Sequence, residues 1–239
     1  MGSKPRLLAG ASLLFDLDGT LVDTAPDLIG ALGALMAEEG LEAPPFAEAR
    51  PMIGAGARRL IQRAFAAAGA PIEETGRIEA LFSRYIALYQ PRIAQESRPF
   101  EGVRETLAEL EAAGARMAVA TNKPTALALE LLTQLDLTWP FRAVVGPEFA
   151  PAQKPDPRHL LAAIERSGGR GVARAVMIGD SVADAHAARS AGVRLVLTEF
   201  GYSQTPVADL GADAVLGSFA ELPAILERLL ACDAVSQPV

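Results

Sequence analysis

Two aspartates that flank a single residue are the most chemically informative feature of the chain. Asp16 and Asp18 directly follow the apolar run 13–15, and a Gly-Thr pair comes next. Residues two apart on a strand point to the same side, so both carboxylates can face one point. Like charges this close need a cation or a shared proton between them, and a divalent metal is the usual cation. The alternatives are a surface turn or part of a calcium loop, although the following Gly-Thr-Leu-Val lacks the ligands that calcium needs.

Three further polar segments follow strand-like apolar runs. Thr121 and Asn122 precede a helical pattern, where a hydroxyl and amides favour an anion, although a simple helix cap has the same sequence. Lys154 is one of three lysines in the chain, and its alternative is a solvated surface position. Asp180 and Asp184 stand four residues apart where a strand gives way to a helix; the alternative is a turn residue and a favourable first-turn charge.

The pattern of elements places these segments at one edge of a sheet. From about residue 116, short β-rich runs alternate with helical Ala/Leu patterns, which predicts a parallel sheet with crossover helices. The expected strands are 12–15, 117–120, 143–145, 175–178, 195–197 and 214–216. The expected helices are 103–113, 125–135, 158–167, 182–191 and 219–231. Sites in open α/β sheets form at the carboxyl ends of the strands, so the polar segments should meet there.

The stretch between Asp23 and about residue 97 has a different pattern. It has almost no strand-like run, and its amphipathic stretches predict helices at 26–39, 57–68 and 73–93. Loops at 40–45 and 69–71 separate them, and 92–99 would be the return hinge. We therefore expect a helical cap domain, residues 24–97, inserted into a catalytic core formed by residues 1–23 and 98–239.

Composition excludes several classes of protein. The 239 residues are half apolar, enough for one core plus a smaller appendage. With a net charge of −7 and no clustered basic residues, nucleic acid is not expected as the main partner. Cys232 stands alone, so it forms no internal disulfide, and no apolar stretch is long enough to span a membrane. We expect a cytoplasmic monomer or homodimer whose tail, from Asp233, is frayed.

In their order along the chain, these segments resemble the four motifs of the haloacid dehalogenase-like hydrolase superfamily. The resemblance spans nearly the whole chain. It implies an α/β fold with a Rossmann-like three-layer core and parallel sheet, a helical cap and magnesium-dependent phosphotransfer. A finer resemblance, to the phosphoglycolate phosphatases of that superfamily, rests on the strings 18–24, 53–60, 120–124 and 199–202.

The resemblance implies a role for each motif residue. Asp16 would be the nucleophile that forms an aspartyl-phosphate, and Asp18 the general acid and base. Asp16, the Asp18 carbonyl and Asp180 would hold Mg²⁺, with Asp184 supporting them. Thr121, the Asn122 amide and Lys154 would bind the phosphoryl oxygens.

The cap would recognise the part of the substrate beyond its phosphoryl group. Phosphoglycolate carries a carboxylate, so a cation or backbone amide from the loop 54–59 is expected to contact it; the alternative is that both arginines of this loop only solvate a helix face. The expected substrate-binding residues are Thr20, Gly54, Gly56, Arg58, Arg59 and Asn122. His159 and His186 fall within helical patterns and are expected to be structural or exposed.

These inferences predict a Mg²⁺-dependent phosphatase that hydrolyses a small anionic phosphate ester, in the first place 2-phosphoglycolate. Another small phosphate ester or pyrophosphate is the main alternative. A phosphosugar mutase is less favoured because such enzymes usually have an apolar residue in place of Thr20, and the dehalogenases lack the full metal pattern. A nucleotide-binding module would need a Gly-rich loop after the first strand, and none follows it. A catalytically dead interaction protein is disfavoured because every expected acid is present.

Overall fold

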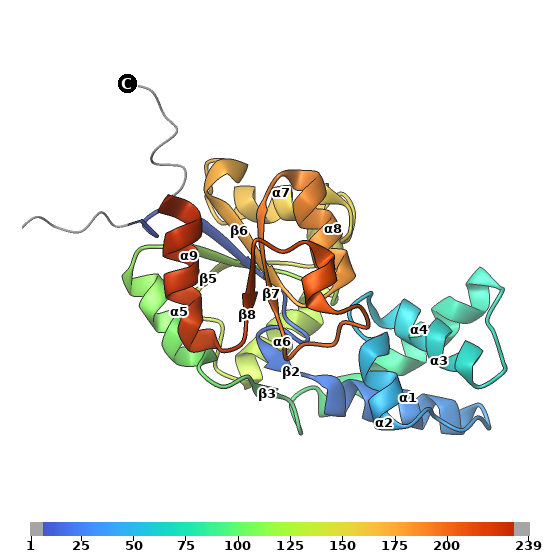
Figure 1. The fold of residues 1–239 in the computed structure, drawn as a ribbon. Coiled ribbons are helices and arrows are strands. Elements are labelled where there is room, and N and C mark those ends of the chain that lie inside the picture. Colours follow the sequence, from blue (N-terminus) through green and yellow to red (C-terminus); the bar gives the residue numbers. More distant parts are fainter. Residues whose placement is uncertain (1–6, 232–239) are drawn as a thin grey trace, which may run out of the picture.

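A computed structural model describes residues 7–231 and shows a parallel sheet covered by helices on both faces (Figure 1). Cys232 and the tail lie outside the described residues. The strands are β1 (Ser12–Phe15), β4 (Arg116–Ala120), β5 (Phe141–Val145), β6 (Ala175–Gly179), β7 (Arg194–Thr198) and β8 (Ala214–Leu216). They form one six-stranded sheet in the order β5-β4-β1-β6-β7-β8, and every neighbouring pair is parallel. The predicted strands and the α/β fold class are confirmed.

Alternation along the strands divides the core into two layers. Leu13 and Phe15 of β1 pack with helices α5 (Val103–Ala112), α6 (Thr125–Gln134) and α9 (Leu222–Ala231). Leu14, between them, packs on the other face with α7 (Pro157–Arg166) and α8 (Val182–Ala191). This is the two-residue period expected of a strand that is buried on both faces. The short 3₁₀ turns η3 (Pro147–Phe149), η4 (Val172–Arg174), η5 (Val207–Leu210) and η6 (Phe219–Glu221) complete this part of the chain.

A group of helices lies beside the sheet, between β1 and α5 in the chain (Figure 1). It comprises α1 (Ala25–Glu38), α2 (Phe46–Ala49), η1 (Arg50–Met52), α3 (Ala57–Ala67), α4 (Thr75–Tyr89) and η2 (Gln90–Arg92). Helix α4 packs against both α1 and α3. The helix predicted over 73–93 is thus α4 followed by a 3₁₀ turn, and the predicted loop at 40–45 leads into α2, which the sequence pattern did not predict. None of the helices in the described residues is long and apolar enough to cross a membrane.

The two linkers to this helical insertion pair with each other. β2 (Val22–Asp23) and β3 (Arg98–Pro99) form a two-stranded antiparallel ribbon where only a hinge was expected. Next to it, the buried carboxylate of Asp27 accepts hydrogen bonds from the Glu96 amide at 3.0 Å and the Ser97 amide at 2.8 Å. We propose that the boundary between core and cap, at residues 24 and 97, falls at this ribbon.

The carboxyl ends of the three central strands bring the sequence motifs together. Phe15 of β1 stands opposite Val119 of β4 and Ile178 of β6. The residues that follow these strands are Asp16, Thr121 and, after Gly179, Asp180. The sheet therefore positions the candidate site at its centre.

Candidate active site

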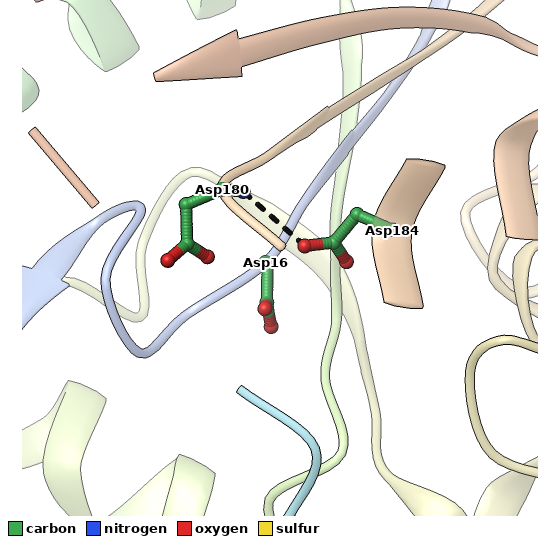
Figure 2. A group of neighbouring side chains, drawn as sticks. All are labelled: Asp16, Asp180 and Asp184. Atoms are coloured by element: carbon green, nitrogen blue, oxygen red, sulfur yellow. Dashed lines mark hydrogen bonds between the residues drawn. The ribbon is translucent and has the colours of Figure 1, made fainter. Parts of the chain in front are cut away.

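Three buried carboxylates gather where β1 and β6 end and α8 begins (Figure 2). Asp16, Asp180 and Asp184 each offer an oxygen, and these atoms lie within 4.8 Å of one another. All three side chains are buried. Such a cluster concentrates negative charge in a place where water cannot screen it, so it needs positive charge nearby.

Asp184 is held by its own helix terminus. Its Oδ2 accepts hydrogen bonds from the Ser181 amide at 3.0 Å, the Ser181 hydroxyl at 2.7 Å and the Asp180 amide at 3.2 Å. Together with the bond from the Asp184 amide to the Ser181 hydroxyl, this makes a capping box on α8. Residue 179 must be glycine here, because a Cβ would lie 2.5 Å from the Asp184 carboxyl carbon. Asp184 is therefore fixed by hydrogen bonds and suits the supporting role that the sequence indicated.

Lys154 supplies the positive charge at one side of the cluster. Its buried ammonium lies 2.6 Å from Asp184 Oδ1 and 3.0 Å from Asp16 Oδ1. Burial alone would lower the pKa of Lys154, but Asp16 and Asp184 raise it above its ordinary value. The solvated-lysine alternative is thereby excluded, and Lys154 is a charged group that orients Asp16.

One lysine does not balance three acids, and the pKa values show the remaining imbalance. Burial raises the pKa of Asp16 to about 7, against the opposing effect of Lys154. Burial, followed by Asp184 and Asp16, raises the pKa of Asp180 well above its ordinary value. A divalent cation would stabilise both in the ionised form, and Mg²⁺ prefers oxygen ligands of this kind. Asp16 and Asp180 therefore fit the expected ion.

Asp180 is placed by groups from two other segments, the turn after β1 and the loop after β7. Its Oδ2 accepts a hydrogen bond from the Tyr202 amide at 2.7 Å, and its Oδ1 accepts one from the Thr20 hydroxyl at 3.3 Å. Gly19 has a positive φ of 84°, and a Cβ there would lie 2.5 Å from Asp180 Oδ2. Thr20 is fully buried and its contact in the structure is with Asp180; its role in substrate binding stays a prediction.

Asp18 faces a different cation from that of Asp16. The ammonium of Lys123 lies 3.0 Å from Asp18 Oδ1 and donates a hydrogen bond to the Tyr89 hydroxyl at 2.7 Å. Tyr89 belongs to α4, so this contact joins the helical insertion to the sheet edge. Sequence reasoning assigned Lys123 no role. Its position one residue after Asn122, at the end of a central strand, was the signal that could have found it.

Thr121 and Asn122 are buried beside these groups. The Thr121 hydroxyl accepts a hydrogen bond from the Lys123 amide at 3.1 Å, and the Asn122 amide nitrogen donates to the Lys154 carbonyl at 3.0 Å. Among the residues that the structure describes, Asn122 Oδ1 is buried without a hydrogen-bond partner. These contacts fix the turn after β4 and link it to the segment that carries Lys154.

A small cavity of about 40 Å³ lies between the carboxyl edge of the sheet and the helical insertion. Its floor includes Asp16, Asp18, Thr121 and Lys123. Its roof is largely apolar and contains Leu28, Ile53, Gly54, Gly56, Leu60, Tyr85 and Tyr89. We call this space the inner cavity; it admits only a small group beside the carboxylates.

Gly54 and Gly56 bring the cap loop close to the core. Both have positive φ, 105° and 88°, where other residues are strained. A Cβ on Gly54 would lie 3.3 Å from the Ser181 side chain, and one on Gly56 would lie 3.7 Å from the Asn122 carbonyl. The loop backbone therefore reaches the inner cavity, and its predicted contact with the substrate stays a prediction.

A second and larger space, of about 600 Å³, lies beside the inner cavity. We call it the outer cavity; its wall includes Gly56 and Asn122, which also line the inner cavity. Arg58 and Arg59 lie on this outer wall and are exposed. Arg58 binds Glu79 at 2.6 Å and stacks 3.7 Å from the Phe82 ring centroid, and Arg59 donates to Gln62 at 3.3 Å. The two arginines thus stand outside the space that Asp16 lines.

The two histidines are placed as expected. His159 is buried, and its ring nitrogens lie 3.0 Å from the Ala152 carbonyl and 3.2 Å from the Val145 carbonyl. Burial lowers the pKa of His159 to about 4. His186 is exposed on α8.

The fold and the motif order define a family. The chain belongs to the haloacid dehalogenase-like hydrolases, whose family model matches residues 13–198. The resemblance that the four motifs indicated is therefore confirmed.

The similar proteins include phosphatases for two kinds of substrate. The phosphoglycolate phosphatase of Caulobacter vibrioides is 53% identical over 228 residues, which cover 95% of each chain. The N-acetylmuramic acid 6-phosphate phosphatase of Pseudomonas aeruginosa is 36% identical over 226 residues, covering 93% of this chain and 96% of that protein. The solved structure of a predicted phosphoglycolate phosphatase from Haemophilus somnus superposes with a TM-score of 0.82 at 28% identity, covering 93% of this chain and 99% of that one.

Proposed function

We propose that this protein is a Mg²⁺-dependent phosphatase that hydrolyses 2-phosphoglycolate to glycolate and phosphate. The observation that carries the proposal is that Asp16 and Asp18, on the floor of one small cavity, pair with different lysines, Asp16 with Lys154 and Asp18 with Lys123. Two acids with separate cationic partners suit two separate roles, a nucleophile and a proton carrier. The 53% identity to a phosphoglycolate phosphatase supports the choice of substrate.

Asp16 is the nucleophile in this proposal. Its carboxylate attacks phosphorus, the bond to the glycolate oxygen breaks, and Asp18 gives its proton to that oxygen. Asp18 then takes a proton from the water that attacks the aspartyl-phosphate, which releases phosphate and regenerates Asp16. When bound by Asp16, the Asp18 carbonyl and Asp180, Mg²⁺ would neutralise charge on the phosphoryl oxygens.

Lys154, Thr121 and the Asn122 amide bind the phosphoryl oxygens. Their buried positions beside Asp16 support this role, because donors fixed in a dry site stabilise developing charge strongly. Asp184 acts through Lys154, and Thr20 acts through Asp180.

Lys123 and the backbone of the loop that carries Gly54 and Gly56 bind the carboxylate of phosphoglycolate. Lys123 supports this assignment because its ammonium lies on the floor of the inner cavity and is held by Tyr89 from the cap. A substrate carboxylate would take the place of Asp18 as a partner of Lys123 once Asp18 is protonated. The small volume of the inner cavity favours a leaving group as short as glycolate.

One assay, phosphate release from phosphoglycolate, tests both the proposed metal and the proposed substrate. Phosphate release from phosphoglycolate should disappear with excess chelator and return with Mg²⁺, and Asp180→Ala should need at least about tenfold more Mg²⁺ than wild type. The exposed acid Asp209 offers a matched control, because Asp209→Ala should keep the wild-type metal requirement. Full turnover in excess chelator would disprove the metal-dependent mechanism.

A second candidate substrate is a larger carboxylated sugar phosphate. The outer cavity favours it, because a volume of about 600 Å³ suits a sugar and Arg58 and Arg59 stand on its wall; typical ligand pockets are about 300–1,000 Å³. The similarity to an N-acetylmuramic acid 6-phosphate phosphatase points to the same class. Comparing kcat/KM for phosphoglycolate, N-acetylmuramic acid 6-phosphate and glucose 6-phosphate decides between the two candidates, and a higher value for either sugar would replace phosphoglycolate.

A further inference from the structure

Tyr202 contacts both the acidic cluster and the start of the helical insertion, which have separate roles in the proposed mechanism. It follows β7 and is buried, with 2% of its surface exposed. Its backbone amide donates to Asp180 Oδ2 at 2.7 Å. At its other end, the phenol oxygen accepts hydrogen bonds from the Thr24 amide at 2.8 Å and the Ala25 amide at 3.0 Å. One residue thus contacts a carboxylate of the acidic cluster and the first turn of α1.

The phenol is also held by the linker that leads into the helical insertion. Its hydroxyl lies 2.6 Å from Asp23 Oδ1, to which it donates, and Asp23 is the last residue of β2. Three hydrogen bonds therefore surround a buried oxygen, and moving the start of α1 would leave them unpaired in a place that excludes water. Unpaired buried groups are costly, so the ring and the linker move together.

The ring is packed from both sides of the boundary. The guanidinium of Arg50, in η1, lies 4.8 Å from the ring centroid and donates to the Phe200 carbonyl at 2.9 Å. On the core side, a Cβ at Gly19 would lie 2.8 Å from the ring, and one at Gly201 would lie 2.2 Å from the Asp180 Cβ. This close packing leaves Tyr202 no room to shift without shifting Asp180.

We infer that Tyr202 is a positioning residue that couples the orientation of the helical insertion to the placement of Asp180. The inference rests on the metal role proposed for Asp180. Coupling of this kind is reciprocal: if the anchored phenol places Asp180 for Mg²⁺, then bound Mg²⁺ must stabilise the anchored phenol to the same extent.

Tyr202→Phe tests the coupling because it removes the phenol oxygen and keeps both the ring and the amide. We expect the Mg²⁺ dissociation constant, measured by calorimetry, to rise about three- to tenfold, the equivalent of about one hydrogen bond. In wild type, Mg²⁺ should slow hydrogen exchange of the Thr24 and Ala25 amides, and this protection should be lost in the variant.

Ser97→Ala is the matched control. Ser97 donates a hydrogen bond to Asp27 at 2.7 Å on the returning linker, so the variant loosens the boundary at the other strand of the ribbon. It should leave the Mg²⁺ dissociation constant within about twofold of wild type. An equal rise in both variants would show that Tyr202 acts only through general stability of the boundary.

Asp23→Asn supplies a second route to the same result, since it weakens the acceptor of the phenol and leaves Tyr202 intact. It should reproduce the weaker Mg²⁺ binding and the loss of protection. Wild-type Mg²⁺ affinity in both Tyr202→Phe and Asp23→Asn would overturn this inference but leave the proposed metal site standing. Failure of the wild-type protein to bind Mg²⁺ would overturn the proposed metal site and this inference with it.

Discussion

The inner and outer cavities share a wall but use their charged residues differently. On the floor of the inner cavity, Asp16 and Asp18 pair with two buried lysines, Lys154 and Lys123, each at 3.0 Å. On the outer wall, Arg58 is about half exposed, and its partner Glu79 is equally so. Buried pairs are costly to break, whereas exposed pairs contribute little. Substitutions on the floor of the inner cavity should therefore impair the reaction, whereas the outer wall should tolerate them.

The largest effect that this comparison predicts is at Asp16. Asp16→Asn should lower kcat for phosphoglycolate by at least about 10³-fold, because an amide is a poor nucleophile and a neutral ligand. Circular dichroism and thermal unfolding should show that the fold is kept. Turnover close to that of wild type would show that Asp16 is not the nucleophile. It would also contradict the expectation that groups of the inner cavity matter more for turnover than those of the outer wall.

Lys123 should show the next largest effect. Lys123→Met should lower kcat/KM for phosphoglycolate by about 10- to 150-fold, the equivalent of losing a charged hydrogen bond of about 1.5–3 kcal/mol. Ethyl phosphate has a methyl group in place of the carboxylate that Lys123 is proposed to bind. Any loss of kcat/KM with this substrate therefore measures the effect of Lys123 on Asp18. The ratio between the two substrates isolates carboxylate recognition, and an equal loss on both would assign Lys123 to Asp18 alone.

The buried core should also link stability to pH through His159. Its pKa in the folded protein is about 4, whereas an unfolded histidine has a pKa of about 6.5, so the unfolded state binds the proton first. This contribution to the free energy of unfolding is complete above pH 6.5 and is lost as the pH falls toward 4, by up to about 3 kcal/mol. Denaturant unfolding at pH 7, 5.5 and 4 should show a smaller loss in His159→Gln than in wild type. His186→Gln, at an exposed position, should follow wild type.

Arg58 and Arg59 should show the smallest effect on phosphoglycolate. Arg58→Ala, Arg59→Ala and the double variant should each change kcat/KM by no more than about fivefold, as expected of exposed pairs worth up to about 1 kcal/mol. Glu79→Gln is the matched control, because it frees Arg58 without removing it. A loss of more than tenfold in the double variant would move carboxylate recognition from the inner cavity to the outer wall.

Much of this arrangement could be predicted from local sequence. The sheet strands have apolar runs of three to five residues between turn signals, and the motif acids follow them directly. The β2–β3 ribbon could not be predicted, because two residues per strand carry no periodicity. The partners of Lys123 and Arg58 depend on how α4 packs on its neighbours, and the contacts of Tyr202 depend on where the chain returns after β7. Contacts between segments that are distant in the chain produce little recognisable pattern in the sequence of either segment.

The central position of β1 has a consequence for how the chain folds. Ser12 stands beside Arg116 on one side and Ala175 on the other, so β1 leaves the ribosome well before either of its neighbours. Pairings this distant in sequence make folding slow and leave an apolar strand exposed to aggregation while the chain grows. The intervening helices can form during that interval, and closure of the β2–β3 ribbon then draws the start of α5 toward β1. The ribbon therefore shortens the search that pairs β4 with β1.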